Sequence, residues 1–178
     1  MNFMGKYQLF VCKVCGDPYL GTDAPSMCPF CGAHSENVVP ANTWEPLWGK
    51  PVQDVSTANL EVALKLEVGA VNFYKNVMDA SDDVGVKKLF KAIMKAEREH
   101  ASTIVKLMDT KMPDLKSWET EADKARDTLE ENLLETRRRE ENAVSVYDKA
   151  ALNSEDEHVK YFFREISKVE ADHILLTE

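Results

Sequence analysis

The sequence predicts a mainly α-helical protein in which a four-helix bundle follows a small domain of loops and short strands. Three observations support this prediction. After Asp54 the only proline is Pro113, and Ala, Leu, Glu and Lys recur in amphipathic patterns typical of helices. The first fifty residues are instead rich in Gly, Pro and aromatic side chains and contain all four cysteines. Within the helical part, one hairpin-sized segment occurs twice. We therefore expect one domain at residues 1–50 and a second at residues 55–178.

Composition narrows the classes of function. A chain of 178 residues can hold a bundle of about 120 residues beside a small domain. The formal net charge of -9 argues against a nucleic-acid partner, because such a surface repels phosphate. The N-terminal sequence lacks the charged and then apolar pattern of a leader, and no apolar run approaches the roughly 20 residues of a membrane helix. We expect a soluble, cytoplasmic protein without a membrane partner.

Caps, polar turns and prolines delimit four expected helices in the second domain. One face of each helix is apolar, and glutamates interrupt these faces. The expected elements are a helix from a cap at Asp54 or Ser56 to about Ala80, a helix from the turn at 81–83 to no further than Lys111, one long helix from Asp114 or Ser117 to Leu152, and a last helix that opens at a cap at Asn153 or Ser154.

The repeat carries ionisable residues on these apolar faces. A shift of the chain by 73 residues aligns residues 67–100 with 140–173 and matches 13 of these 34 positions. Such a match indicates a duplicated helical hairpin. The ionisable residues shared by the two copies are Glu67 and Glu140, Glu97 and Glu170, and His100 and His173.

The repeated Glu and His residues match the ligand set expected for a metal site. Glu and His three residues apart lie on adjacent turns of one helix face and can offer an oxygen and a nitrogen to one ion. A Glu-x-x-His from each of two helices and a Glu from each of the other two is the arrangement of di-iron carboxylate bundles. Two divalent irons would also offset four buried negative charges. Retention of surface-facing residues by descent is the alternative, but all six fall on stripes of Leu, Ile, Val and Phe. The predicted ligands are Glu67, Glu97, His100, Glu140, Glu170 and His173.

Two tyrosines and a further Glu-His pair allow two interpretations each. Tyr74 and Tyr147 lie two turns beyond Glu67 and Glu140, on the same helix faces. They are either core aromatic residues or hydrogen-bond donors to the carboxylates. We take both as candidate catalytic residues. Glu155 and His158 have the same spacing as the repeated pairs, but this pair has no counterpart in the repeat. We expect it to be solvated surface in an acidic first turn.

The four cysteines predict a second metal site. Cys12 and Cys15, and Cys28 and Cys31, are each spaced by two residues and each pair is followed by a glycine that permits a tight turn. In a reducing compartment such a cluster is more often a metal site than two disulfides. Four thiolates suit either zinc, as in a structural zinc ribbon, or iron. Iron is favoured because a redox di-iron bundle needs one-electron donors. The aromatic core expected for this domain comprises Tyr7, Phe10, Tyr19, Phe30 and Trp44.

Motifs along nearly the whole chain resemble those of the rubrerythrins. The segment YQLFVCKVCGDPYLGTDAPSMCPFCGA resembles a rubredoxin domain. The segments LEVGAVNFY with KAEREH, and REENAVSVY with KVEADH, resemble a ferritin-like di-iron domain. The rubredoxin-like part comes first, which reverses the commoner order. The resemblance implies a ferritin-like four-helix bundle preceded by a rubredoxin-like domain of β-strands and loops.

The resemblance also implies an activity and partners. It implies a non-haem peroxidase that reduces hydrogen peroxide to water at two irons in the bundle, with electrons from one iron on the four cysteines. A rubredoxin or an NAD(P)H-dependent reductase would supply the electrons. The family typically forms homodimers in which the rubredoxin domain of one subunit serves the di-iron site of another.

One departure from the family pattern leaves other activities open. Rubrerythrins usually carry an additional carboxylate one turn from the Glu of the third helix. Here the residues one turn away from Glu140 are Arg137 and Ala143, and Glu141 is rotated by about 100° off that face. The six-ligand site therefore also suits a ferroxidase or a dioxygen-reducing oxidase. A non-catalytic metal-binding protein with a structural zinc ribbon is the third alternative.

Overall fold

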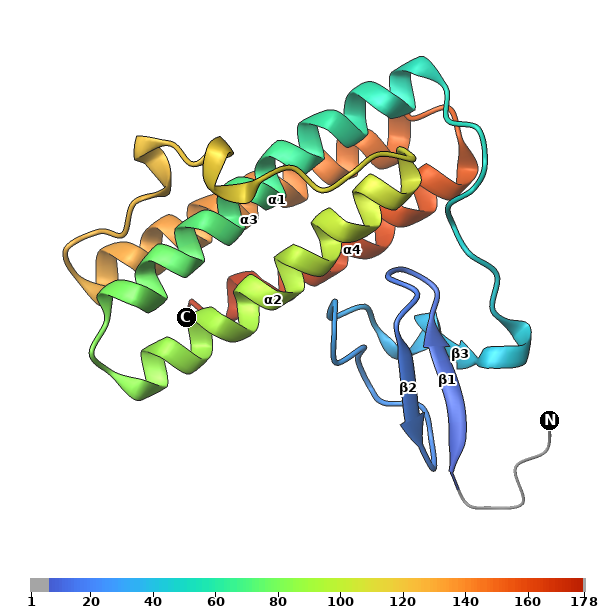
Figure 1. Cartoon of the computed structure of the whole chain (residues 1–178), viewed down its shortest axis with the longest axis horizontal. Helices are drawn as coiled ribbons and strands as arrows, with labels where there is room; N and C mark the ends of the chain where they lie inside the picture. Colours follow the sequence, from blue (N-terminus) through green and yellow to red (C-terminus); the bar gives the residue numbers. More distant parts are fainter. Residues whose placement is uncertain (1–6, 178) are drawn as a thin grey trace.

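The computed structural model describes residues 7–177 and consists of a four-helix bundle with a small sheet beside it (Figure 1). Residues 1–6 of the first predicted domain and residue 178 of the second lie outside the described residues. The helices are α1 (Asp54–Ala80), α2 (Val84–Leu107), α3 (Leu129–Asn153) and α4 (Glu157–Leu175). Short turns join α1 to α2 and α3 to α4, so each pair is an antiparallel hairpin. The predicted fold class, a ferritin-like bundle preceded by a rubredoxin-like domain, is confirmed.

Side-chain caps fix the starts of two helices. The Asp83 carboxylate accepts a hydrogen bond from the Val86 N–H at 2.9 Å, at the polar turn where the start of α2 is predicted. At α3, the Thr128 hydroxyl accepts from the Glu131 N–H at 3.2 Å while the Glu131 carboxylate accepts from the Thr128 N–H at 3.0 Å. This reciprocal capping box satisfies two backbone donors that the first turn leaves free.

The prediction of one long helix from Asp114 or Ser117 to Leu152 is wrong. Residues 113–128, here called the strap, instead contain two 3-10 turns, η3 (Leu115–Trp118) and η4 (Glu121–Asp123), before α3 begins. Capping boxes at Thr120 and at Thr128 each start a new element and so interrupt a continuous helix. The α1 side chains Asn72 and Asn76 hold the strap by donating to its carbonyls, at 2.7 Å and 2.9 Å. The strap thus lies along the outside of α1 and α3 (Figure 1).

Helix α1 ends at Ala80 and α2 lies between the turn at 81–83 and Lys111, as expected, whereas the other predicted ends shift by one to three residues. Helix α1 follows Gln53 and contains both expected caps, and α4 follows Asp156. The expected caps of α4 belong to the preceding helix, because the Ser154 N–H still donates to the Ala150 carbonyl of α3. Helix α2 ends at Leu107, and Asp109 then takes a positive φ of 49° that turns the chain away.

The predicted apolar faces pack inward, with one exception at the start of α3. The α4 face is buried throughout, from Val159 to His173. Leu129 was expected in line with this core but is 45% exposed, in the first turn of α3. None of the helices in the described part of the chain is long and apolar enough to cross a membrane.

A three-stranded antiparallel sheet supports the cysteine loops. Its strands are β1 (Gln8–Cys12), β2 (Pro18–Gly21) and β3 (Val38–Pro40), in the order β2-β1-β3, and 3-10 turns η1 (Ser35–Asn37) and η2 (Ala41–Thr43) flank β3. Phe10 of β1 is buried and lies opposite Tyr19, with 6.5 Å between their rings. The expected aromatic core is only partly correct. Tyr7 is 67% and Phe30 40% exposed, while Trp48 packs with Trp44, 5.9 Å between rings.

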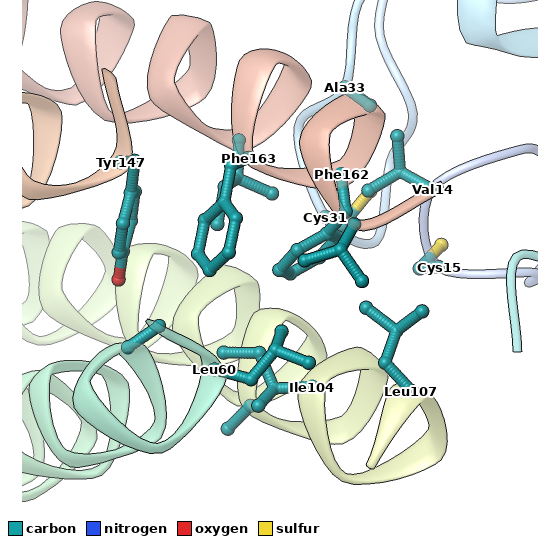
Figure 2. Packing of buried hydrophobic residues seen from close by; sticks show 14 of the residues in the cluster. Val14, Cys15, Cys31, Ala33, Leu60, Ile104, Leu107, Tyr147, Phe162 and Phe163 are labelled. Atoms are coloured by element: carbon teal, nitrogen blue, oxygen red, sulfur yellow. The ribbon is translucent and has the colours of Figure 1, made fainter. Parts of the chain in front are cut away.

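The sheet and the cysteine loops, here called the cysteine module (residues 8–40), pack against α2 and α4. Figure 2 shows Val14, Cys31 and Ala33 beside Phe162, within one apolar cluster that continues into the bundle. The approach is close, because a Cβ added at Gly32 would lie 2.8 Å from Val169 Cγ1. The module is therefore docked on the bundle of its own chain.

A buried polar contact orients this docking. Asn37 is fully buried, donates from Nδ2 to Glu165 Oε2 at 2.8 Å, and accepts from the Tyr161 hydroxyl. Lys168 also pairs with Glu165, at 2.9 Å. Because buried polar groups are costly unless paired, this network favours one position of the module on α4.

We predict that Asn37→Ala destabilises the protein by about 1–3 kcal/mol, because it leaves the Tyr161 hydroxyl without its acceptor and leaves Lys168 as the donor to Glu165 Oε2. Chemical denaturation followed by circular dichroism measures this change. The matched control is Glu36→Gln at the same interface, where an exposed carboxylate lies 3.5 Å from Lys168. We expect that control to change stability by less than about 0.5 kcal/mol. Equal effects of the two substitutions would contradict an orienting role for Asn37.

Candidate metal centres

The six side chains predicted as bundle ligands meet in the interior of the four helices. They come from α1 (Glu67), α2 (Glu97, His100), α3 (Glu140) and α4 (Glu170, His173), and each is at most 9% exposed. They form two overlapping groups whose ligand atoms lie within 4.8 Å of one another. One group contains Glu67 and His100, the other contains Glu140 and His173, and both contain Glu97 and Glu170. The geometry thus has two places for an ion, with two carboxylates common to both.

Both imidazoles direct Nδ1 at the shared carboxylates. His100 Nδ1 lies 3.0 Å from Glu170 Oε1 and 3.2 Å from Glu97 Oε2. His173 Nδ1 lies 3.0 Å from Glu97 Oε1 and 2.9 Å from Glu170 Oε2. The two rings are stacked with centroids 6.4 Å apart. Residues three apart on α2 and α4 place these atoms on one helix face, and the antiparallel hairpins bring the two faces together.

Protons balance the charge of this cluster when no metal is bound. Burial, together with the carboxylates of Glu97 and Glu170, raises the pKa values of Glu67 and Glu140 well above their usual range. Burial acts on Glu97 and Glu170 in the same direction, but the histidines lower the pKa values of both below the usual range. These shifts favour the protonated form of Glu67 and Glu140 and the carboxylate form of Glu97 and Glu170.

The histidines carry the compensating charge. Burial alone would lower their pKa values, but Glu170 and Glu67 raise the pKa of His100, and Glu97 and Glu170 raise that of His173, well above the usual value. The charged form of both histidines is therefore favoured opposite Glu97 and Glu170, which offsets their negative charge.

Several oxygen and nitrogen atoms of this cluster have the positions of metal ligands rather than of hydrogen-bond partners. Within the described residues, Glu97 Oε1, both carboxylate oxygens of Glu170 and His173 Nδ1 are buried without a hydrogen-bond partner. His173 Nδ1 is within ion-pair distance of Glu97 Oε1, yet the two atoms do not have the geometry of a hydrogen bond. Buried polar atoms normally have partners, so atoms that converge on a common point without bonding indicate a place for an ion.

Each tyrosine donates a hydrogen bond to a glutamate of the opposite hairpin. The Tyr74 hydroxyl on α1 donates to Glu140 Oε1 on α3, and the Tyr147 hydroxyl on α3 donates to Glu67 Oε1 on α1. Burial, together with the nearby carboxylates, raises the pKa of both tyrosines well above the usual value, so they remain protonated donors. The repeat in the sequence does not reveal that each tyrosine bonds to the glutamate of the other copy.

The four cysteine sulfurs are spaced as expected for the ligands of one tetrahedral metal ion. Sγ of Cys12 is 3.7 Å from Sγ of Cys31, and Sγ of Cys15 is 3.8 Å from Sγ of Cys28. A tetrahedral ion with bonds of about 2.3 Å separates its sulfurs by about 3.8 Å, whereas a disulfide needs about 2.05 Å. All four thiols are buried and unbridged. This geometry suits zinc and iron equally.

Glycines and a backbone contact complete the cysteine loops. Gly16 and Gly32 have φ values of 80° and 78°, which other residues rarely adopt, and their N–H groups donate to the Cys12 and Cys28 carbonyls at 2.9 Å and 3.0 Å. The Cys31 carbonyl in turn lies 2.8 Å from His100 Nε2. One hydrogen bond therefore links a cysteine of the module to a histidine of the bundle cluster.

Sequence reasoning missed the residues that connect and cover the cluster. The Cys31 carbonyl carries no sequence signal, because every residue has one. Asp123 of the strap pairs with Arg139 of α3 at 3.1 Å. It follows Thr120 by three residues, which is the spacing of a capping box and is visible in the sequence. Glu155 and His158 lie outside both clusters. Glu155 is exposed as expected, but His158 is half buried, and this burial lowers its pKa.

Comparisons with known proteins agree with this geometry. The sequence profile of the rubrerythrin family matches residues 58–176. Reverse rubrerythrin-1 of Clostridium acetobutylicum is 31% identical over 110 residues, which cover 56% of this chain and 61% of that protein. The chain thus spans about three fifths of the length of this relative. No solved structure matches.

We predict that loading the bundle cluster with ferrous ions releases about four protons for two ions, two from imidazolium groups and two from neutral carboxyls, because ligands bind deprotonated. Ion affinity should accordingly fall as the pH falls. Anaerobic calorimetric titrations in buffers of different ionisation enthalpy measure the release, in protein whose cysteines already hold metal. Glu67→Gln should release about three protons. A release near zero would contradict the assigned protonation.

We also predict that Tyr74→Phe and Tyr147→Phe each weaken ferrous binding at the bundle cluster by about 10–100-fold, because each leaves one glutamate without the donor that orients it. Competition with a chelator measures the affinity. Tyr19→Phe, which removes a hydroxyl in β2 far from the cluster, is the control and should bind normally. Unchanged affinity in both cluster variants would show that the tyrosines serve only as core side chains.

Proposed function

The chain belongs to the rubrerythrin family, and from this premise we propose that it is a di-iron oxidoreductase that reduces hydrogen peroxide to water. The observation that carries the proposal is the presence of two buried donor clusters, one of four cysteines and one of four glutamates and two histidines, linked by a hydrogen bond. We propose that residues 1–50 and 55–178 act as an electron-transfer unit and a catalytic unit.

In this proposal Glu97 and Glu170 would contribute ligand oxygens to both irons, because both carboxylates belong to both donor groups. Glu67 and His100 complete one iron site. Glu140 and His173 complete the other. Four carboxylates would then balance two divalent ions, so the loaded cluster is neutral. Bound ferrous ions supply the two electrons that reduce a peroxide.

The other roles follow from contacts within the cluster. Tyr74 and Tyr147 orient Glu140 and Glu67 through their hydrogen bonds, and as protonated phenols they keep a donor directed at each carboxylate. We propose that both are positioning residues. Burial of the Tyr74 and Tyr147 side chains keeps these hydrogen bonds strong, because the local dielectric is low.

We propose iron rather than zinc on Cys12, Cys15, Cys28 and Cys31, because only iron can pass single electrons to the bundle. The short route from the Cys31 carbonyl to His100 Nε2, 2.8 Å apart, supports this role. The contact lies within one chain, so each subunit of the proposed homodimer could supply its own bundle cluster. A rubredoxin or an NAD(P)H-dependent reductase in the cytoplasm is the proposed electron donor.

A second candidate function is dioxygen reduction or ferrous oxidation, which the absence of a seventh carboxylate favours. The cluster contains no further carboxylate among the described residues. Ala70 and Ala143 occupy the places one turn beyond Glu67 and Glu140, and Glu141 is exposed and pairs with Arg137 at 3.2 Å. The site is therefore symmetric, with six protein ligands.

Anaerobic mixing of the fully reduced protein with hydrogen peroxide tests the proposal, with iron oxidation followed by its visible absorption. We expect oxidation to be faster than with the same concentration of dioxygen. Oxidation that is no faster with peroxide would favour the second candidate.

Metal analysis with a visible spectrum tests the cysteine site. A ferric tetrathiolate is red, whereas zinc is colourless, and a colourless cysteine site would contradict the electron-transfer role. We predict that Cys12→Ser abolishes steady-state peroxide reduction with an external donor while the first oxidation of reduced bundle iron persists. Its control is Ser145→Ala on the exposed face of α3, which should support both reactions.

A further inference from the structure

A cavity of about 500 Å³ reaches the carboxylates of the bundle cluster from the side opposite the cysteine module. It lies between α1 and α3 under the strap and touches Glu67, Glu97, Glu140 and Glu170. A water molecule occupies about 30 Å³ in the liquid, so hydrogen peroxide, with two non-hydrogen atoms, needs only a small part of this space. Pockets of about 300–1,000 Å³ are typical of sites for organic molecules.

Small residues at repeat-related positions create this space. Ala70 on α1 and Ala143 on α3, related by the 73-residue shift, line the cavity one turn beyond Glu67 and Glu140. A longer side chain at either alanine would fill the cavity beside the carboxylates. Gly69 adds room on α1, where a Cβ would already lie 3.4 Å from Asp123 Oδ1.

Side chains above the carboxylates give the cavity an apolar lining. Trp118 of the strap and Leu66 of α1 form part of its wall, with the Tyr147 ring deeper inside. The cations near it are either exposed or already paired. Arg138 is largely exposed, and Arg139 is held by Asp123 at 3.1 Å and by Glu135 at 2.8 Å. Apolar walls above a floor of carboxylates favour a neutral ligand with an apolar group over an anion.

We infer that this cavity binds neutral organic hydroperoxides, R–O–OH with an apolar R group, with the O–OH end at the carboxylates and R against Trp118, Ala70 and Ala143. The inference rests on the proposed function, whose ferrous ions supply the electrons. The O–O bond breaks as the hydroperoxide takes up two electrons and two protons from solvent, giving the alcohol R–OH and water. Ala143 would thus determine how large an R group the protein accepts.

The test compares hydrogen peroxide with cumene hydroperoxide in the iron-loaded full chain and in Ala143→Leu. We expect the wild type to reduce both. In Ala143→Leu we expect kcat/KM for cumene hydroperoxide to fall at least about tenfold further than kcat/KM for hydrogen peroxide, because the larger substrate loses its space first. The control is Ser145→Leu, which adds the same side chain on the exposed face of α3 and should behave like the wild type.

Binding of the product alcohol gives a readout that needs no turnover. Cumyl alcohol has no O–O bond, so calorimetric titration of the full chain reports cavity binding alone. We expect binding to the wild type and to Ser145→Leu, and none to Ala143→Leu. Trp118→Ala is a second test in case Ala143→Leu does not fold, because it opens the strap side of the cavity. It should raise the rate with bulkier hydroperoxides relative to the rate with hydrogen peroxide.

The outcomes separate this inference from the proposed function. A protein that reduces hydrogen peroxide but neither binds cumyl alcohol nor reduces cumene hydroperoxide would overturn the inference. The proposed function would then still stand. Equal loss of both peroxide activities in Ala143→Leu, with normal iron content, would also overturn it. Alcohol binding in a protein that reduces neither peroxide would overturn the proposed function, and the substrate inference with it.

Discussion

Four carboxyl groups buried between apolar helix faces impose the constraint to which the rest of the bundle responds. Their negative charge has to be neutralised, because an isolated carboxylate in an apolar interior is strongly disfavoured. The raised pKa values of His100, His173, Glu67 and Glu140 favour a proton on each of these groups, which offsets this charge. Two divalent cations would provide the same balance in place of four protons. The converging but unbonded oxygens of Glu97 and Glu170 are consistent with that second state.

The duplicated hairpins meet this constraint only as a pair. Each tyrosine donates to a glutamate of the opposite hairpin, and the glutamates common to both donor groups come one from each copy. A single hairpin would leave a tyrosine hydroxyl and several carboxylate oxygens without partners. Pairing of the two copies therefore completes the cluster, which ties the stability of the bundle to the residues at its centre.

Two features break the symmetry of the bundle, and they do so on opposite sides. The cysteine module packs on α2 and α4, where the Cys31 carbonyl meets His100. The strap covers α1 and α3, where the cavity reaches the same carboxylates. Under the proposed function, electrons arrive through one side while the oxidant arrives through the other, so neither route has to be vacated for the other to work.

The sequence by itself determined the helix faces, the six converging bundle residues and the four clustered cysteines, because these depend on spacing along the chain. Residues three apart share a helix face wherever the helix lies. It did not determine which tyrosine meets which glutamate, how the cysteine module docks, why Phe30 and Leu129 are exposed, or where the cavity lies. Thr120 and Thr128 have the spacing of capping boxes, and these caps interrupt the expected long helix although the surrounding residues favour helix. Periodicity reports which face of a segment is buried, whereas the partner of that face depends on packing between segments distant in sequence, and only the tertiary structure decides it.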